Sequence, residues 1–345
     1  MDEQEKSLEK ASLVFVKDIL HLEKGKKFLI YVDQDSDIET AKAIQSCAEK
    51  NGVQTSLLEL NSDLESADKL KELLHRIENG NFDAICELSA QFFFMTVAWQ
   101  KASELGCRIY SLGAVDTDSF IRCVGQSDYR LMYQFGTALV KTLRKAKSIQ
   151  ILTEQGTHIE FKMIPSSLLN RILSKLRLIK GPSQRSWIEL PPTLMAGQVA
   201  FQASPNTIEG TAVIDGYLWP PEEINPIDEP IILKIKKGSV VEISGCPSKS
   251  QILEKWLDGK EKVIKHFCIG FNPGAELSGK IIEAERVFGS ISMGFGKHPF
   301  HTDGIFENAS LLMNGQMIIK NGEFVHKDLS LLGKDLIQHY HDSRE

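Results

Sequence analysis

The sequence predicts an α/β N-terminal domain with a parallel sheet, followed by a β-rich α+β domain that binds metal. Strand-like and helix-like segments alternate over residues 1–148, and short strands separated by turn residues fill residues 149–345. Alternating strands and helices are typical of a parallel sheet covered by helices, whereas closely spaced short strands are typical of antiparallel sheets. We therefore expect two domains with these boundaries. Two histidines and an aspartate near the C-terminal end are the candidate metal ligands.

The first domain is expected to begin with an amphipathic helix over residues 5–23, where apolar residues recur at helical spacing. Asp37 is placed to cap the next helix. Neither GxGxxG nor GxxxxGK followed by Ser or Thr comes after the first strand, so a nucleotide site has no support. The expected strands span residues 28–33, 53–60, 81–88 and 107–112, and the further helices span residues 38–51, 64–79, 92–105 and 128–148.

The second domain is expected to contain short strands at SIQILTE, THIEFKM, QVAFQAS, GTAVIDGYL, IILKIKKG and VVEISG. A helix is expected over residues 249–259, and a final helix or a frayed tail over residues 327–345. The stretch ASLLMNGQMIIKNGEFV holds two Asn-Gly pairs between apolar runs, a pattern that predicts a meander of hairpins. Residues 165–192 are irregular and basic, and we expect either a surface excursion or a lid or dimer arm there.

Composition places the chain among ordinary globular proteins. Apolar residues make up 42% of the 345 residues and charged residues 25%. A net charge of −6 gives no reason to expect nucleic acid or an anionic membrane as a partner. No apolar run is long enough to span a bilayer, and the acidic N-terminus lacks signal-peptide features, so we expect a cytoplasmic location. The six cysteines are scattered without a CxxC pair, which favours reduced, mostly buried thiols.

The stretch from His266 to Phe306 holds the candidate metal ligands. His301 and Asp303 are two residues apart, so in a strand their side chains point to the same face. His266 then needs only to lie on a neighbouring strand. Two histidines and one carboxylate form the ligand set of mononuclear non-haem iron sites, with zinc and manganese as alternatives. The same spacing also fits a strand without metal and an ordinary, partly buried His266.

Four segments of the second domain occur in a characteristic order: MAGQVAFQAS, EGTAVIDG, HFCIGFNPGAELSGKIIEAERVFGSISMGFG and HTDG. In the first domain, ETAKAIQSCAEKNGVQTSLLEL and ASELGCRIYSLGAVDTDSFIRCV resemble helix–strand units of the same family. With these segments the chain resembles the T-type (thermophilic, leucyl-type) metallo-aminopeptidase superfamily, which also contains 2,5-dihydroxypyridine dioxygenases. The resemblance implies a small-molecule substrate and a homodimer that pairs through the second domain.

The chain departs from the aminopeptidase pattern at three metal-ligand positions. Gln198 and His266 stand where the aminopeptidases carry glutamates, and Ser292 stands where they carry a histidine. Only His301 and Asp303 match outright. The dioxygenase branch resembles this chain in having a histidine at the position of His266. The resemblance therefore implies one divalent cation, iron(II) before zinc or manganese, held by His266, His301 and Asp303. Gln198 and Ser292 would then line the cavity and bind substrate.

Three functions follow from this comparison. The first is a mononuclear metal-dependent enzyme similar to 2,5-dihydroxypyridine dioxygenases. The second is a metal-dependent aminopeptidase, for which Glu209 is the only nearby candidate base. The third is a binding protein that has lost its metal. His298 is either a nearby acid–base group or an exposed residue, and the first domain has Met95–Thr96 where relatives carry a histidine base.

Overall fold

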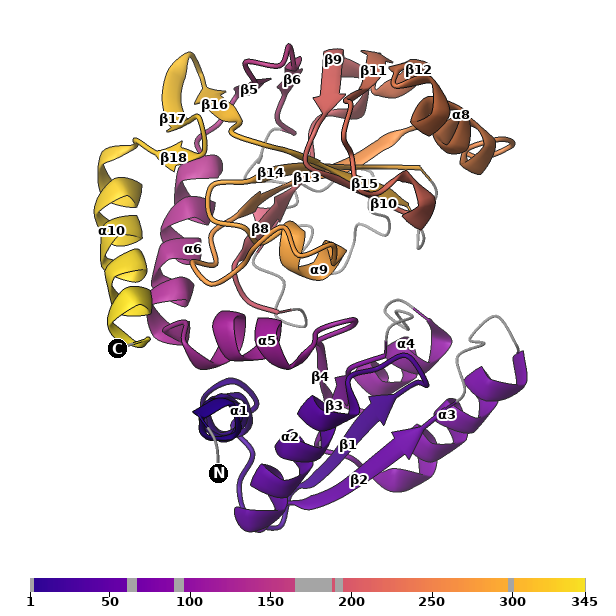
Figure 1. Ribbon diagram of the computed structural model, residues 1–345, viewed down its shortest axis with the longest axis vertical. Helices are drawn as coiled ribbons and strands as arrows, with labels where there is room; N and C mark the ends of the chain where they lie inside the picture. Colours follow the sequence, from indigo (N-terminus) through magenta and orange to yellow (C-terminus); the bar gives the residue numbers. More distant parts are fainter. Residues whose placement is uncertain are drawn as a thin grey trace, which may run out of the picture.

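The strands of this protein lie in three sheets in the part of the chain that the structure describes. The computed structural model describes residues 3–60, 67–89, 96–164, 188–189, 195–296 and 301–344. A four-stranded sheet lies in the lower body of Figure 1, and sheets of six and eight strands lie in the upper body. The predicted fold class, an α/β part with a parallel sheet followed by a β-rich part, is confirmed.

The first sheet is parallel throughout and has the strand order β2-β1-β3-β4. Its strands are β1 (Lys27–Val32), β2 (Gln54–Glu59), β3 (Ala84–Glu87) and β4 (Arg108–Ser111). Alternate residues of the strands enter two separate apolar clusters, one on each face, as expected for a buried parallel sheet. The flanking helices are α1 (Glu3–Val14), α2 (Ile38–Lys50), α3 (Ala67–Gly80) and α4 (Val97–Glu104).

Two local features of this body bear on the sequence predictions. Asp37 caps α2 as predicted, because its side chain accepts hydrogen bonds from the backbone N–H groups of Glu39 and Thr40. The helix expected over residues 5–23 is shorter: α1 ends at Val14, and Phe15–Ile19 form a π-helical turn. That turn places the Phe15 ring edge-on against Tyr110, at 5.3 Å between ring centroids, inside the apolar core.

The six-stranded sheet has the order β10-β15-β14-β13-β8-β7, and the eight-stranded sheet the order β12-β11-β9-β6-β5-β16-β17-β18. The strands of the first are β7 (Ile188–Glu189), β8 (Gln198–Phe201), β10 (Tyr217–Trp219), β13 (Ile264–Gly270), β14 (Ile291–Phe295) and β15 (Thr302–Phe306). Those of the second are β5 (Ser148–Leu152), β6 (His158–Lys162), β9 (Glu209–Ile214), β11 (Ile231–Lys236), β12 (Ser239–Gly245), β16 (Ser310–Met313), β17 (Gln316–Lys320) and β18 (Glu323–Phe324).

These two sheets pack face to face around one large apolar core. The rings of Phe161 on β6 and Phe267 on β13 stack across the interface with centroids 4.5 Å apart. Since side chains alternate along a strand, the neighbours of Phe267, His266 and Cys268, point away from this core. Figure 1 shows the short helix α9 (Ile281–Ala284) on that second face, toward the four-stranded sheet. The candidate ligands therefore lie between the two bodies.

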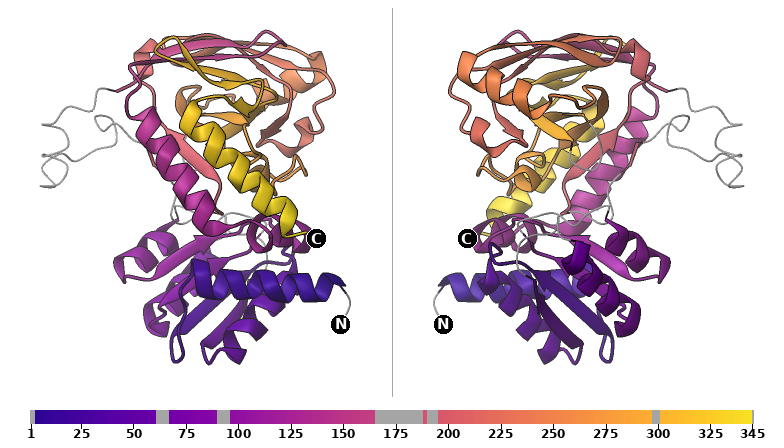
Figure 2. Two further views of the ribbon diagram at one scale, coloured as in Figure 1. Left: turned by 90° about the vertical axis from the view of Figure 1, so that its left-hand side faces the viewer. Right: turned by 90° about the vertical axis from the view of Figure 1, so that its right-hand side faces the viewer.

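Helices close the sides of the upper body. α6 (Tyr129–Leu143) and α10 (Lys327–Asp342) pack against each other, and both contribute to the core of the two larger sheets (Figure 2). α10 confirms the expected final helix, and α8 (Pro247–Trp256) lies where residues 249–259 predicted one. α6 lies before residue 148 in the chain but packs within the upper body. The division of the chain into two domains at residue 148 stays a prediction.

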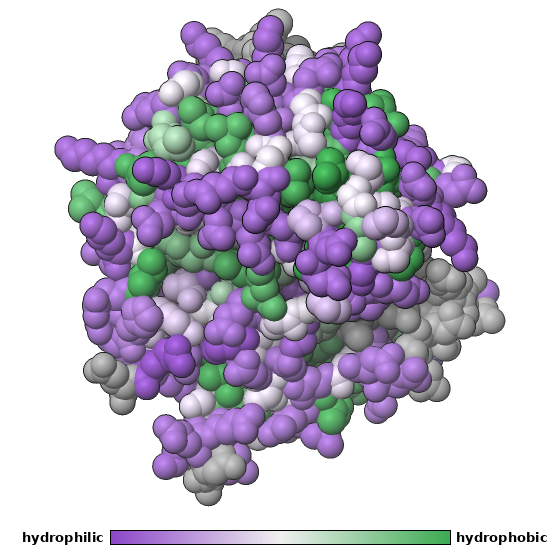
Figure 3. Space-filling model, turned by 45° about the horizontal axis from the view of Figure 1, so that its top comes forward, coloured by the Kyte–Doolittle hydropathy of each residue, from purple (hydrophilic) through white to green (hydrophobic). Residues whose placement is uncertain are grey.

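The outer surface is mostly hydrophilic on the side seen in Figure 3, with apolar residues in small separate patches. No helix among the described residues is long and apolar enough to cross a membrane. Of the segment 165–192, the described part is β7, which pairs with β8 at the edge of the six-stranded sheet. The rest of that segment lies outside the described residues.

Candidate metal centre

One row of four residues crosses the six-stranded sheet on the face that points away from the large core. Trp219 on β10 pairs with Asp303 on β15. Gly294 on β14 pairs with Asp303 on one side and with His266 on β13 on the other. Residues directly opposite each other in antiparallel strands project their side chains to the same face. The side chains of Asp303 and His266 therefore flank a glycine.

His301 joins this row from the residue before β15. Its Nε2 lies 3.1 Å from Oδ2 of Asp303, and Nε2 of His266 lies 3.3 Å from Oδ1 of the same carboxylate. The two imidazole rings are nearly perpendicular, at 88°, with centroids 4.8 Å apart. The structure thus brings together the three side chains that the sequence suggested as ligands, with one ligand atom of each within 4.8 Å of the others.

The spacing of these atoms fits one cation. Ligands about 2.0–2.2 Å from one metal ion, at right angles to one another, lie about 3 Å apart. The two nitrogen–oxygen distances, 3.1 Å and 3.3 Å, are close to that value. Oδ1 of Asp303 is also buried, yet it accepts no hydrogen bond of normal geometry from the described residues. The donor set, two imidazoles and one carboxylate, suits iron, zinc or manganese.

Gly294 leaves the room in which the ligands meet. A Cβ atom at this position would lie 2.3 Å from Cε1 of His266 and 2.6 Å from Oδ1 of Asp303. Gly294 does not have the left-handed backbone conformation that favours glycine, so the reason for a glycine here is space: any Cβ would displace the side chains of His266 and Asp303. The three candidate ligands keep between 11% and 17% of their side-chain surface exposed. A small molecule can therefore reach a mostly buried site.

Asp303 and His266 stabilise each other's charged forms. Burial disfavours the charged form of His266, but contact with Asp303 and the negative charges of Asp303 and Glu285 outweigh it and raise the pKa of His266. Burial also opposes ionisation of Asp303, yet the charge of His301 and the contacts with both imidazoles hold its pKa well below the usual range. Without metal, the site therefore holds an ionised carboxylate and a histidine that protonates readily.

Glu285 is a residue of this site that sequence reasoning missed. It follows α9, and its Oε1 accepts a hydrogen bond from Ser292 Oγ at 3.1 Å. Together with His266 and Cys268 it forms a second group whose ligand atoms lie within 4.8 Å of one another. Burial, followed by the charge of Asp303, raises the pKa of Glu285. One signal in the sequence was a carboxylate inside the motif segment that leads to the GSIS strand.

The two residues expected to bind substrate lie on the same face of the sheet at different distances from the ligands. Ser292 pairs with Cys268, and its hydroxyl is engaged by Glu285. Gln198 pairs with Gly270, four positions along β13 from His266, which corresponds to about 13 Å along a strand. Gln198 is buried. A substrate-binding role for Ser292 and Gln198 stays a prediction.

The remaining sequence candidates lie elsewhere. Glu209 is on β9 of the eight-stranded sheet, where its side chain accepts a hydrogen bond from the backbone N–H of Lys237 at 2.9 Å. Since β9 belongs to the other sheet, Glu209 does not lie among the candidate ligands. His298 and Met95 lie outside the described residues, whereas Thr96 is the N-cap of α4.

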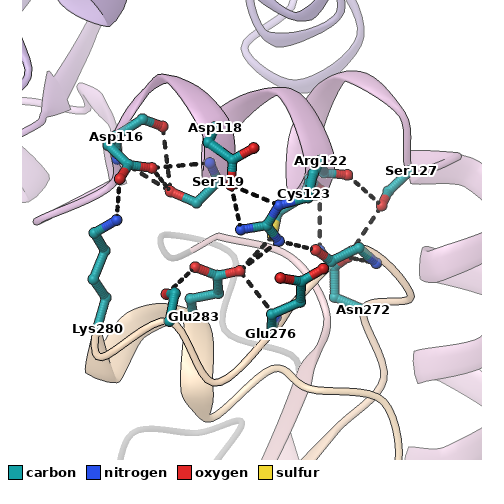
Figure 4. Close-up of polar contacts among 12 residues, drawn as sticks. Asp116, Asp118, Ser119, Arg122, Cys123, Ser127, Asn272, Glu276, Lys280 and Glu283 are labelled. Carbon is teal, nitrogen blue, oxygen red and sulfur yellow. Dashed lines mark hydrogen bonds and ion pairs between the residues drawn. The ribbon is translucent and has the colours of Figure 1, made fainter. Parts of the chain in front are cut away.

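A buried polar network fixes the segment that carries Glu285 (Figure 4). The carboxylate of Glu283 has no exposed surface and accepts a hydrogen bond from Arg122 Nη1 at 2.6 Å and one from the backbone N–H of Glu276 at 2.9 Å. Arg122 lies in the π-helical turn η2 (Ile121–Gly125), which follows α5 (Thr117–Phe120) after the four-stranded sheet. The network therefore ties α9 to the lower body.

Two further contacts strengthen this connection. Lys280 donates a hydrogen bond to Asp116, the N-cap of α5. Burial alone would raise the pKa of Asp116, but the bonds from Lys280 and Ser119 outweigh burial and lower this pKa to about 2. The Asn272 amide donates to the backbone carbonyls of Cys123, at 3.0 Å, and Ala196, at 3.1 Å. The position of Glu285 beside the ligands thus depends on contacts between distant parts of the chain.

Known proteins share this fold. A solved structure of 2,5-dihydroxypyridine dioxygenase from Pseudomonas putida KT2440 matches with a TM-score of 0.73 and 15% sequence identity, covering 93% of this chain and 98% of the other. Wild-type AmpT from Thermus thermophilus matches with a TM-score of 0.60 and 12% identity, covering 93% of this chain and 99% of the other. At these identities the matches show a common fold. Among curated protein sequences, none matches this chain.

A family comparison goes further than the fold. The family model for NicX, described as 2,5-dihydroxypyridine 5,6-dioxygenase, matches residues 16–326, which include both bodies and all three candidate ligands. The resemblance expected from the ordered motifs is thereby confirmed. The chain belongs to the 2,5-dihydroxypyridine 5,6-dioxygenase family.

Proposed function

We propose that this protein is a mononuclear metal-dependent dioxygenase that opens the ring of a small dihydroxylated aromatic compound, with 2,5-dihydroxypyridine as the first candidate. His266, His301 and Asp303 hold one divalent cation, with iron(II) as the preferred metal. The observation that carries this proposal is the convergence of these three side chains within 4.8 Å, in a chain of this family. Three protein ligands leave about half of an octahedral coordination sphere for substrate and dioxygen.

The cation, when bound, supplies Lewis acidity and one-electron chemistry for the reaction of an aromatic diol with dioxygen. The residues of the chain set the conditions. Asp303 contributes one negative charge and the neutral imidazoles none, so the cation with these three ligands keeps a net positive charge that favours an ionised hydroxyl group of the substrate. A 5,6-dioxygenation breaks the bond between those ring carbons and places both oxygen atoms in the product, so the substrate itself supplies the electrons.

Glu285 adds a second acidic group next to the ligands. Its Oε1 is held by Ser292, and the network of Arg122 and Glu283 fixes the helix before it. A negative charge beside a metal-ligating histidine raises the basicity of that ligand. We propose that Glu285 acts in this way on His266, outside the set of direct ligands.

Oxygen uptake tests the proposal. Protein loaded with iron(II) under anaerobic conditions is mixed with 2,5-dihydroxypyridine, and dioxygen consumption and loss of ring absorbance are followed together. We expect equimolar consumption of substrate and dioxygen, lost in Asp303→Asn and kept in His158→Asn, which changes an exposed histidine of β6 in the other sheet. Metal-loaded protein that consumes no dioxygen with any dihydroxylated ring would contradict the proposal.

Hydrolysis by a metal-dependent aminopeptidase is the second candidate. His266 belongs to two groups of potential ligands, one with His301 and Asp303 and one with Cys268 and Glu285. A centre with two cations needs a second set of ligand atoms next to the first. Metal analysis separates the candidates: one equivalent with dioxygen uptake supports the first, and two equivalents with release of leucine from leucine amide support the second.

The homodimer and the cytoplasmic location stay proposals, and sedimentation equilibrium tests the homodimer.

A further inference from the structure

We propose that Trp219 determines substrate specificity by presenting its indole ring as a wall on which the planar ring of the substrate stacks. The inference rests on the proposed function, because it takes the cation at His266, His301 and Asp303 as the point that anchors the substrate. It goes beyond that function by naming the residue that selects a flat aromatic ligand over other metal-binding molecules.

The register of the sheet puts Trp219 beside the candidate ligands. Trp219 pairs directly with Asp303, so their side chains stand next to each other on one face of the sheet. β10 is the edge strand on this side, so Trp219 ends the row that runs from His266 over Gly294 and Asp303. Neighbouring strands are about 4.8 Å apart, so an indole at this position reaches a ring anchored above Gly294 and Asp303.

Trp219 packs against an apolar cluster next to the candidate ligands. The next row of the same face, Tyr217 and Ile305, is covered by Ile281 and Ala284 of α9, and Trp219 packs against the margin of this cluster. The hydroxyl of Tyr217 donates to the carbonyl of Gly279 at 2.7 Å, which fixes that residue. Trp219 itself is only partly buried, whereas Tyr217 and Leu218 are buried. Part of Trp219 therefore stays accessible on the edge strand that borders the candidate ligands.

The backbone of β10 is held in place although it lies at an edge. The side-chain amide of Asn225 accepts a hydrogen bond from the Leu218 N–H at 3.2 Å and donates to the Leu218 carbonyl at 2.6 Å. These bonds satisfy the backbone N–H and carbonyl of Leu218, which point to the open edge of β10 and form no hydrogen bonds with another described strand. The Leu218 side chain is fully buried in the large core on the opposite face. A recognition residue on such a rigid element selects ligands more sharply than one on a mobile loop.

Stacking distinguishes ligand classes that the cation alone does not. An indole offers a wide, electron-rich face, and offset stacking of two aromatic rings contributes about 0.5–1.5 kcal/mol beyond the buried area. A bidentate ligand without a ring binds the cation equally well but gains nothing from the indole. The chemical class selected is therefore a planar aromatic ring that carries metal-binding groups.

Binding to zinc-loaded protein tests this inference without turnover. Zinc has no redox chemistry, so picolinate, a pyridine carboxylate, and oxalate, which has no ring, can be titrated in air by calorimetry. The variants are Trp219→Leu, Trp219→Phe and, as a matched control, Trp256→Leu. Trp256 donates from Nε1 to Thr302 Oγ1 at 3.2 Å, so it contacts the residue next to Asp303 from the opposite face of the same strand.

We expect Trp219→Leu to weaken picolinate binding about tenfold, the loss that corresponds to one stacked ring. Oxalate binding and zinc affinity should not change, Trp219→Phe should keep most of the picolinate affinity, and Trp256→Leu should bind both ligands like the wild type. The inference would be overturned if Trp219→Leu changed the affinities for picolinate and oxalate equally or changed neither. It would also be overturned if Trp219→Leu lost zinc or its fold, or if the wild type did not bind picolinate. A wild-type protein that takes up no zinc would instead overturn the proposed metal site, and an absence of oxygenase activity would leave these binding results valid.

Discussion

Gly294→Ala is the substitution that tests the geometry of the metal centre with the smallest chemical change. The added Cβ would lie 2.3 Å from Cε1 and 2.8 Å from Nδ1 of His266, and 2.6 Å from Oδ1 of Asp303. Ordinary contacts of a Cβ atom begin near 3.4 Å. The imidazole and the carboxylate must therefore separate by roughly 1 Å, whereas ligand distances in metal sites tolerate only about 0.2 Å.

The expected loss follows from this displacement. Inserting one methyl group into a well-packed site costs about 1–3 kcal/mol, and each 1.4 kcal/mol corresponds to a factor of about ten in affinity. In metal-free protein the His266 ring can rotate away from the methyl group, but a bound cation requires the original position. Most of the strain therefore falls on the metal-bound state. We expect Gly294→Ala to bind divalent metal about 10- to 100-fold more weakly than the wild type.

The assay is competition for zinc or cobalt(II) against a chromogenic chelator, with thermal unfolding of the metal-free protein as a second measurement. Gly304→Ala is the matched control: its Cβ would lie 2.2 Å from Cδ1 of Ile214, on the face of β15 that packs in the large core. We expect Gly304→Ala to lower the unfolding temperature and to leave metal affinity unchanged. A folded Gly294→Ala protein with wild-type metal affinity would refute the assignment of the site.

Three further predictions concern the charges around this centre. Asp303→Asn should lower metal affinity by more than about 100-fold, measured by the same competition, because it removes the only negative charge among the ligands; an affinity within tenfold of the wild type would speak against Asp303 as a ligand. The affinity for zinc should fall as the pH drops, starting above the ordinary histidine pKa, because the pKa of His266 is raised and the cation must displace its proton. Asp303 stays ionised over this range because its pKa is lowered. A zinc affinity independent of pH from 8 to 6 would contradict this. Arg122→Met should lower the free energy of unfolding in urea by about 3–5 kcal/mol, because it leaves the fully buried carboxylate of Glu283 without its guanidinium partner. Lys234→Met breaks an exposed ion pair with Glu242 and should change the free energy of unfolding by less than about 1 kcal/mol. Equal effects of these two substitutions would show that the buried pair is not needed for stability.

Local patterns in the sequence predicted most of the elements and two of the three side chains that meet at the candidate metal centre. A strand has a side-chain period of two, so His301 and Asp303 had to share a face once residues 302–306 were extended. The two Asn-Gly pairs predicted the hairpins that became β16, β17 and β18. These features depend on residues close together in the chain, where propensity and periodicity act.

The rest depends on contacts between distant segments, which no local pattern records. The six-stranded sheet pairs β10 with β15 and β13 with β8, and this order decides that Trp219 stands beside Asp303. The requirement for Gly294 becomes visible only when the His266 ring lies over it. Arg122 and Glu283 are 161 positions apart, so their pairing, which fixes the helix before Glu285, follows from the packing of the two bodies.

The most direct test of the account is a crystal structure of the iron(II)-loaded protein, prepared without oxygen, with anomalous diffraction recorded at the iron edge. The account predicts one peak, with the imidazoles of His266 and His301 and the carboxylate of Asp303 at about 2.0–2.2 Å from it. An iron held by Cys268 and Glu285, two peaks of equal height, or a peak away from these residues would contradict the claim that this chain holds one cation with two histidines and one aspartate.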